Sequence, residues 1–475
     1  MSVLNGLQPK RVFEIFEAIA AIPHGSGNTD AISRWCCSFI HNLGIKACRD
    51  NVGNVLAYKN GSAGREEEAP IILQAHLDMV CEKTADKVFD FTKDGIQVKT
   101  DGQTVWADGT TLGADNGIGL AMILAVLEET TLSHPPVEAV LTIDEETGLE
   151  GAINVDFATL QGRRMINLDS EDEGVFTAGC AGGVRMEALF PLTFVPNHRP
   201  AYRVHLKDLW GGHSGIEINQ GRCNANRALA DFILTLQQQN AVELCSFSGG
   251  SVENAIPSEA ACVIATDLAE NHLLQLAQNL VKTLQEQGES AASVVVEAVS
   301  EPLVMHSDCT KAILTYMTES PNGVQAMCKD LPDLVETSLN LGVVRQNEQT
   351  LSVLSSLRSS VETEKQALLA RLQELAAQKG ADTTVSGDYP GWEYRADSAL
   401  QDTMKQVYAK LTGNEPVVNV IHAGLECGLF CQKCPELDAI SMGPNMKNVH
   451  TPEERVEVAS VARIYAFLVS LLEQL

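Results

Sequence analysis

The alternation of apolar and polar residues along the chain predicts helices and strands that follow one another. Residues 70–80 form a continuous apolar run, which is typical of a strand buried on both faces. Residues 137–144 and 165–169 show the same pattern, and residues 114–130 have the strongly apolar face of a helix. Alternating strands and helices predict an α/β fold with a mixed, mostly parallel sheet flanked by helices.

The middle of the chain predicts a second domain. Glycines in residues 180–183 interrupt the first pattern, and the Gly-, Pro- and aromatic-rich residues 386–398 end the segment that follows. The pattern of the first domain returns after that segment. We therefore expect one domain made of residues 1–182 and 394–475, interrupted by an inserted α+β domain of residues 183–393.

Composition and charge narrow the class of protein. The 475 residues suggest two or three domains, and the net charge of −28 disfavours nucleic acid and anionic membranes as partners. No apolar run is long enough to span a bilayer, and charged residues in the N-terminal segment predict an amphipathic helix instead of a signal peptide. The thirteen scattered cysteines indicate a reducing cytoplasm, and we expect Cys431 and Cys434 to be structural or incidental thiols.

Two adjacent acidic residues, Glu145 and Glu146, stand where an apolar strand ends. Neighbouring carboxylates repel each other unless a cation or a proton compensates them, so a metal site is one interpretation. A solvated acidic turn closed by Gly148 is the other. His76 and Asp78 close another strand on the same face, where the carboxylate can orient the imidazole for a metal.

Three further residues have an ordinary interpretation when each is taken alone. Asp115 could cap the helix that it opens, Asp169 could be a turn residue at a strand end, and His450 could be a turn histidine. In open sheets, ligands bind at the carboxyl ends of the strands, where most of these side chains are expected. The joint order H-x-D, D-N-G, E-E, L-D and H-T-P-E therefore favours a metal site.

This ordered set resembles the two-zinc peptidase and deacylase superfamily, and within it the aminoacyl-histidine dipeptidases, also called Xaa-His dipeptidases or peptidase D. The resemblance covers nearly the whole chain. It implies a fold of the zinc exopeptidase type, in which the inserted domain serves as a hinged lid and dimerisation domain. The segments that carry the resemblance are QAHLDMVCEK, GTTLGADNGIG, TIDEETGLEGA, INLDSEDEG, WGGHSG, IHAGLECG and GPNMKNVHTPEERV.

The resemblance implies a zinc metallopeptidase that hydrolyses unblocked dipeptides, in particular Xaa-His dipeptides such as β-alanyl-histidine. One zinc ion would be held by His76 and Asp169 and the other by Glu146 and His450, with Asp115 bridging both. Manganese or cobalt could substitute for zinc at such a site. An N-acyl amino-acid deacylase and a metal- or peptide-binding protein without catalysis remain as alternatives.

Further roles follow from the same resemblance. Glu145 would be the general base for a water shared by the two zinc ions, and Asp78 would orient the imidazole of His76. His213 would stabilise the oxyanion, often across the interface of a homodimer. The residues expected to bind the substrate are Asn254, Arg358 and Gly424.

Overall fold

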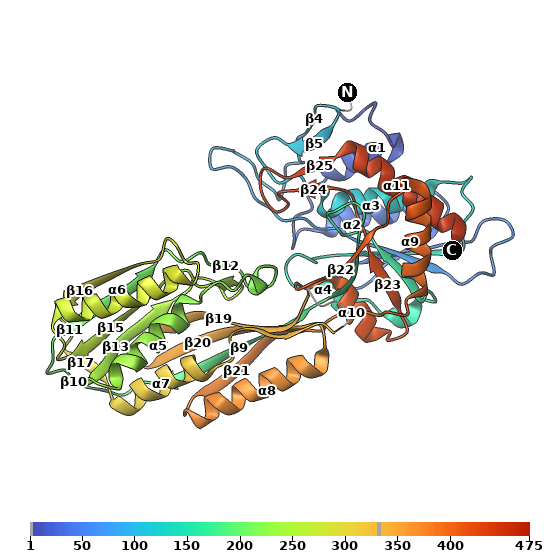
Figure 1. Cartoon of the computed structure of the whole chain (residues 1–475). Coiled ribbons are helices and arrows are strands. Elements are labelled where there is room, and N and C mark those ends of the chain that lie inside the picture. Colours follow the sequence, from blue (N-terminus) through green and yellow to red (C-terminus); the bar gives the residue numbers. More distant parts are fainter. Residues whose placement is uncertain (1–2, 330–333) are drawn as a thin grey trace. The chain divides into compact units, whose positions relative to one another are not determined.

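The computed structural model describes residues 3–329 and 334–475, which divide into two compact units (Figure 1). The chain leaves unit 1 after Cys180 and returns to it at Trp392. These two residues exchange backbone hydrogen bonds of 2.9 and 2.8 Å, so the two connections lie side by side. Unit 1 comprises Met1–Cys180, Trp392–Val420 and Leu425–Leu475, and unit 2 comprises Ala181–Gly391 and Ile421–Gly424.

Unit 1 is built on an eight-stranded mixed sheet in the order β1-β2-β6-β3-β7-β23-β8-β22. The central strands β6, β3, β7 and β23 run parallel. Every residue of β3 and β6 is buried, as expected for strands covered by helices on both faces. The predicted α/β class is confirmed. The strands are β1 (Lys46–Arg49), β2 (Val55–Lys59), β3 (Ile71–His76), β6 (Val137–Thr142), β7 (Arg164–Asn167), β8 (Val175–Cys180), β22 (Val417–Ile421) and β23 (Asp438–Ser441).

The longer helices of unit 1 share one hydrophobic core with this sheet. Helix α3 is buried along most of its length, which matches its lack of a polar face. The helices are α1 (Lys10–Ala20), α2 (Asp30–Asn42), α3 (Ala114–Glu128), α4 (Glu150–Asn154), η1 (Phe157–Thr159), α9 (Ala399–Thr412), α10 (Glu426–Lys433) and α11 (Val458–Gln474). A small antiparallel sheet in the order β24-β25-β5-β4 is formed by β4 (Val98–Thr100), β5 (Thr104–Ala107), β24 (Met446–Lys447) and β25 (Arg455–Glu457).

Three aromatic side chains join the C-terminal helix to this core. Phe467 of α11 is fully buried, and its ring lies 5.6 Å from Phe176 and 5.3 Å from Tyr408. Phe467→Ala is expected to lower the free energy of unfolding by about 3–5 kcal/mol, because it removes burial and leaves a cavity. Urea unfolding followed by circular dichroism would measure this loss. Leu411→Ala, at a position 46% exposed, is the control and should change it little.

Unit 2 has its own hydrophobic core, formed by a nine-stranded antiparallel sheet and four helices. The main path of the sheet is β16-β11-β15-β13-β19-β20-β9-β21, and β18 pairs with β19. Its strands are β9 (Gly182–Pro191), β11 (Ala201–Lys207), β13 (Val242–Gly249), β15 (Ala260–Thr266), β16 (Ser293–Val299), β18 (Gly323–Met327), β19 (Val335–Gln346), β20 (Thr350–Ser359) and β21 (Asp382–Tyr389).

Smaller elements complete unit 2. Two short sheets are formed by β10 (Phe194–Pro196) with β17 (Leu303–Met305), and by β12 (Gly212–His213) with β14 (Ala255–Ile256). The helices are α5 (Ala225–Gln237), α6 (Glu270–Glu286), α7 (Ser307–Glu319) and α8 (Glu362–Gln378), together with η2 (Ile218–Gln220).

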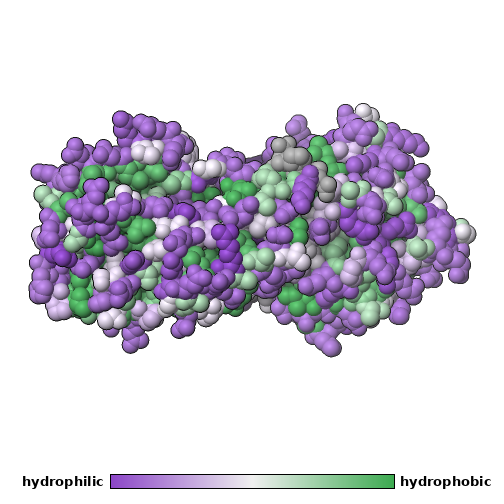
Figure 2. Space-filling view, turned by 60° about the horizontal axis from the view of Figure 1, so that its bottom comes forward, coloured by the Kyte–Doolittle hydropathy of each residue, from purple (hydrophilic) through white to green (hydrophobic). Residues whose placement is uncertain are grey.

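Hydrophilic residues cover most of the face drawn in Figure 2, and apolar residues there form scattered patches. Across residues 3–329 and 334–475, no helix is both long and apolar enough to cross a membrane.

The cysteines are free thiols. Cys431 lies in α10 and Cys434 caps the end of that helix. Burial raises the pKa of Cys431 to about 12, so its thiol stays protonated at neutral pH and is a poor nucleophile. In the part of the chain that the structure describes, the one cluster placed to hold a metal contains no cysteine.

Candidate metal centre

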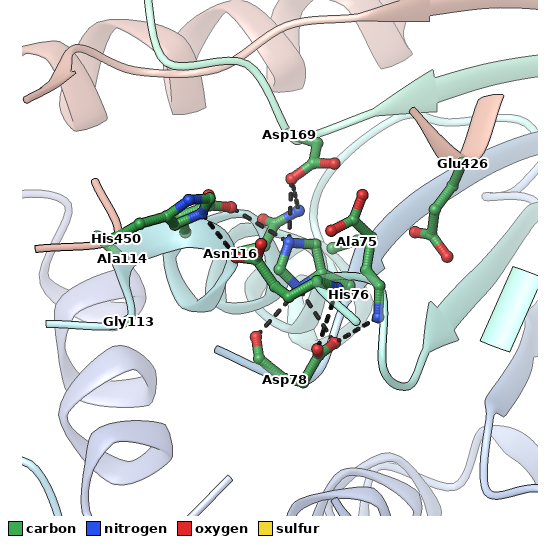
Figure 3. Close-up of polar contacts among 12 residues, drawn as sticks. Ala75, His76, Asp78, Gly113, Ala114, Asn116, Asp169, Glu426 and His450 are labelled. Atoms are coloured by element: carbon green, nitrogen blue, oxygen red, sulfur yellow. Dashed lines mark hydrogen bonds and ion pairs between the residues drawn. The ribbon is translucent and has the colours of Figure 1, made fainter. Parts of the chain in front are cut away.

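His76, the last residue of β3, has oxygen atoms on both sides of its ring (Figure 3). Its Nδ1 lies 3.0 Å from the backbone oxygen of Asp78 and 3.4 Å from Oδ1 of the same residue. Its Nε2 lies 3.2 Å from Oδ1 of Asp115 and 3.3 Å from Oδ1 of Asp169. Asp78 therefore orients the ring so that Nε2 faces the two carboxylates, as in a metal-binding histidine held by a carboxylate.

Asp115 joins two groups of ligand-type side chains. Its Oδ1 faces His76, and its Oδ2 lies 3.1 Å from Nε2 of His450. The same nitrogen of His450 lies 2.8 Å from Oε1 of Glu146. Ligand atoms of His76, Asp115 and Glu146 lie within 4.8 Å of one another. The structure thus brings His76 and Asp169 to one oxygen of Asp115, and Glu146 and His450 to the other.

The electrostatics of this cluster suit divalent cations. Burial, reinforced by the carboxylates of Asp115 and Glu146, raises the pKa of Asp169 to about 6. Hydrogen bonding to Asp115 and Glu146 raises the pKa of His450 to about 11. Carboxylate oxygens and imidazole nitrogens directed at common points are the donor set that zinc prefers, so these residues fit a metal pair.

Asp78 also holds the turn that carries Glu145. Its Oδ1 accepts a hydrogen bond from the backbone N–H of Glu145 (3.0 Å), and its Oδ2 accepts from the N–H of Glu146 (3.3 Å) and the hydroxyl of Ser26 (2.8 Å). Burial raises the pKa of Glu145 well above its ordinary value. A raised pKa makes a carboxylate a stronger base, which suits a group that accepts a proton and passes it on.

Asn116 contacts the cluster without having been predicted. Its Nδ2 donates a hydrogen bond of 2.6 Å to Oδ1 of Asp169, which holds that carboxylate toward His76. Asn116 belongs to the D-N-G motif and lies in the first turn of α3. Only the fold shows its contact with Asp169.

Glu426, the first residue of α10, is a second residue that the sequence did not reveal. It is fully buried, its side chain is drawn in Figure 3, and its pKa is influenced by burial and by the charges of His76 and Asp169. Its Oε2 accepts hydrogen bonds from Nε2 of Gln74 (2.6 Å) and Oγ1 of Thr142 (2.8 Å). Burial raises its pKa to about 8. The segment IHAGLECG contains Glu426, but its letters do not tell which residue points inward.

His213 lies in unit 2, at the start of a tight turn. Its Nδ1 accepts hydrogen bonds of 3.1 Å from the backbone N–H groups of Gly215 and Ile216. Burial and the guanidinium of Arg358 lower its pKa, which favours the neutral ring. Since Nδ1 is an acceptor, the proton of the neutral ring is on Nε2, which can donate a hydrogen bond. Asn254 is exposed. Its backbone oxygen accepts a hydrogen bond from the N–H of Ser214, the residue after His213.

Arg358 lies on β20 of unit 2 beside other polar side chains. Its Nη1 donates to the hydroxyl of Tyr389 (3.2 Å), whereas its buried Nε has no hydrogen-bond partner among the described residues. A Cβ at Gly424 would lie 2.8 Å from the ring of Tyr389, so glycine allows this close approach.

His422, which the sequence analysis did not single out, has an imidazole Nε2 that lies 2.7 Å from the hydroxyl of Ser338. Burial, together with Arg358, lowers the pKa of His422 to about 3.

Comparison with known proteins defines the class. Residues 72–474 match the model of peptidase family M20/M25/M40. Since this match spans most of the sequence, the chain belongs to that family and is a peptidase.

Particular relatives agree with this assignment. The chain is 37% identical over 482 residues to the cytosol non-specific dipeptidase of Escherichia coli (strain K12), with 100% of this chain and 99% of that protein covered. Its structure matches the aminoacylhistidine dipeptidase from Vibrio alginolyticus with a TM-score of 0.93 and 37% identity, covering 99% and 98% of the two chains. The aminopeptidase PepT from Bacillus cereus shares the fold, with a TM-score of 0.59 and 15% identity over 98% and 99%. The resemblance drawn from the sequence motifs is confirmed.

Proposed function

We propose that the chain hydrolyses unblocked dipeptides with two divalent cations held at the candidate metal centre. The observation that carries this proposal is the placement of Asp115, whose two carboxylate oxygens face His76 and His450 respectively. Asp169 and Glu146 complete the two groups, one on each side. The names of the Escherichia coli and Vibrio relatives, both dipeptidases, support the substrate class.

Around such a metal pair, different residues of the chain would transfer protons and hold the ligands in place. Bound zinc ions would polarise the peptide carbonyl and let water ionise near neutral pH. Glu145 would accept the proton of the attacking water and pass it to the leaving amine. Asp78 would keep the ring of His76 in place through its backbone oxygen and the backbone of Glu145 in place through its carboxylate.

Four residues of unit 2 are proposed to recognise the substrate. The unused Nε of Arg358 is suited to a carboxylate, here the C-terminus of a dipeptide. The neutral ring of His213 is suited to donate a hydrogen bond to the oxyanion that develops at the attacked carbonyl. Asn254 and Gly424 are proposed to contact the substrate on the family resemblance alone.

Two relatives support different specificities. The Vibrio protein is named for aminoacyl-histidine substrates, and the Escherichia coli protein is named as non-specific. We propose a preference for Xaa-His dipeptides, including β-alanyl-histidine. A broad dipeptidase is the second candidate, because that relative is equally similar in sequence over the whole chain.

A substrate panel tests the proposal. The zinc-loaded protein is expected to release free histidine from β-alanyl-histidine and Ala-His, and to leave N-acetyl-histidine intact. Removal of the metal with a chelator should lower the rate by roughly a hundredfold or more, and zinc should restore it. Liquid chromatography of the free amino acids measures both effects.

The panel also separates the alternatives. Equal cleavage of Ala-Leu and Ala-His would favour the broad dipeptidase, and cleavage of N-acetyl-histidine alone would favour a deacylase. Activity that survives complete removal of metal would contradict the proposed chemistry.

The remaining proposals concern the metal, the assembly and the location. We infer zinc because the donor set is imidazole and carboxylate, with manganese or cobalt as substitutes, and elemental analysis of the purified protein identifies the ion. A homodimer is proposed from the family resemblance, and sedimentation equilibrium tests it. A cytoplasmic location is supported by the name of the Escherichia coli relative.

A further inference from the structure

A buried carboxylate, that of Glu454, holds the loop that leads to Asp115. Glu454 is only 2% exposed. Its Oε2 accepts hydrogen bonds from the backbone N–H groups of Leu112 (2.7 Å) and Gly113 (3.1 Å). Its Oε1 accepts from the N–H groups of Ala114 (2.8 Å) and Asp115 (3.4 Å). Four successive backbone donors therefore converge on one side chain.

The backbone of this loop is shaped for an anion. Gly113 has φ +70°, in the left-handed region, and consecutive N–H groups around such a residue form a concave nest for negative charge. A Cβ at Gly113 would also lie 2.7 Å from the sulfur of Met79, so glycine is required on both counts. Ala114 and Asp115 are the first residues of α3, where backbone N–H groups lack partners within the helix. Glu454 supplies the acceptors that they need.

Glu454 belongs to the segment that carries His450. Glu454 lies four residues after His450 in the sequence. The backbone N–H of Glu454 donates to the backbone oxygen of Thr451 (3.1 Å), which closes the turn between His450 and Glu454. The side chain of Glu454 thus connects the turn of His450 to the loop of Asp115 by hydrogen bonds. Asp115 lies 335 residues before His450 in the sequence. At the metal centre, Nε2 of His450 lies 3.1 Å from Oδ2 of Asp115.

We propose that Glu454 is a positioning residue that sets the orientation of the bridging Asp115 relative to His450, and thereby the affinity of both cation sites. This role rests on the proposed metal pair. Because Asp115 faces both groups of ligands, a displacement of its backbone weakens both sites. Loss of His450 itself would weaken only the site that it shares with Glu146.

Glu454→Gln tests this role with little change of volume. Glutamine keeps one carbonyl acceptor, but its amide NH₂ would face two backbone N–H donors and repel them. We expect both zinc dissociation constants to rise by about 10–100-fold, the usual effect of losing a group that orients metal ligands. Competition with a chromophoric zinc chelator measures the two constants. The visible absorption of the cobalt-loaded variant should also change, since the geometry around Asp115 changes.

Two further variants control the experiment. Glu453→Gln removes the neighbouring exposed carboxylate and should bind zinc as the wild type does. Glu454→Asp keeps both oxygens and the charge on a shorter side chain, and it should recover part of the lost affinity. This variant supplies the measurement if Glu454→Gln does not fold.

The outcomes separate this inference from the proposed function. If the wild type binds two zinc ions and Glu454→Gln binds both equally tightly, the positioning role is wrong and the metal pair stands. Lower stability of the metal-free variant with unchanged zinc affinity would likewise reduce Glu454 to a structural residue. If the wild type binds no pair of cations, the proposed function fails, and the role of Glu454 fails with it.

Discussion

Glu145→Gln is expected to reduce kcat for dipeptide hydrolysis by about 10²–10⁴-fold, the usual contribution of a general acid–base residue. The amide has nearly the shape of the carboxyl group but cannot accept the proton of the attacking water. The backbone N–H of Glu145 still donates to Asp78, so the turn that carries Glu146 keeps its place. Steady-state kinetics with Ala-His measures the loss.

The metal content of this variant distinguishes chemistry from binding. Glu145→Gln should retain two zinc ions per chain in elemental analysis, because Glu146 supplies the ligand oxygen at this turn. Glu150→Gln, which removes an exposed carboxylate in the following helix, is the control and should leave both kcat and zinc content unchanged. Activity of Glu145→Gln close to that of the wild type would exclude its role as the base. Loss of zinc from it would assign Glu145 to metal binding instead.

Asp115→Ala is expected to abolish the binding of both cations and to lower kcat/KM by at least roughly 100-fold. Its two oxygens face His76 and His450, so a single substitution takes one ligand from each site. It also removes the negative charge that lies between the two imidazole rings. Elemental analysis after gel filtration gives the zinc content, and kinetics on the zinc-supplemented protein gives the residual activity.

His450→Ala provides the contrast for this experiment. It removes a ligand from only one site, so the zinc content should fall from two toward one. Asp172→Asn, at an exposed position three residues after Asp169, is the control for a general effect of charge and should keep two zinc ions. If Asp115→Ala retained both ions, the bridging role of Asp115 would be wrong.

Local pattern was sufficient for the long apolar elements of unit 1. The apolar run of residues 70–80 contains β3, and the apolar residues after Gly113 form most of α3, because burial on both faces favours apolar residues along each element. The short strands β4 and β5 were not predicted, since three or four residues show no period. The long paired strands β19 and β20 of unit 2 were also not predicted. Their partners decide which residues are buried, and partners are not visible in one strand.

The ligand-type residues were predictable for a physical reason. Parallel strands end at a common edge, so Asp78, Glu145 and Asp169, which follow three such strands, had to lie near each other. His450 came from the joint order of the motifs and Arg358 from the family resemblance alone, because nothing local in their segments marks a ligand. Glu426, Glu454 and His422 were not predicted, since a buried acid or histidine looks in sequence like an exposed one.

The sequence by itself therefore determined the class of fold, the family and the residue types of the candidate metal centre, because periodicity, short motifs and strand ends are local properties. Only the tertiary structure decided how those residues meet. It placed His450 against Asp115 across 335 residues, and it turned the backbone N–H groups of residues 112–115 toward Glu454. Such contacts depend on packing between segments that are far apart in the chain, and packing of that kind leaves no local pattern in a single sequence.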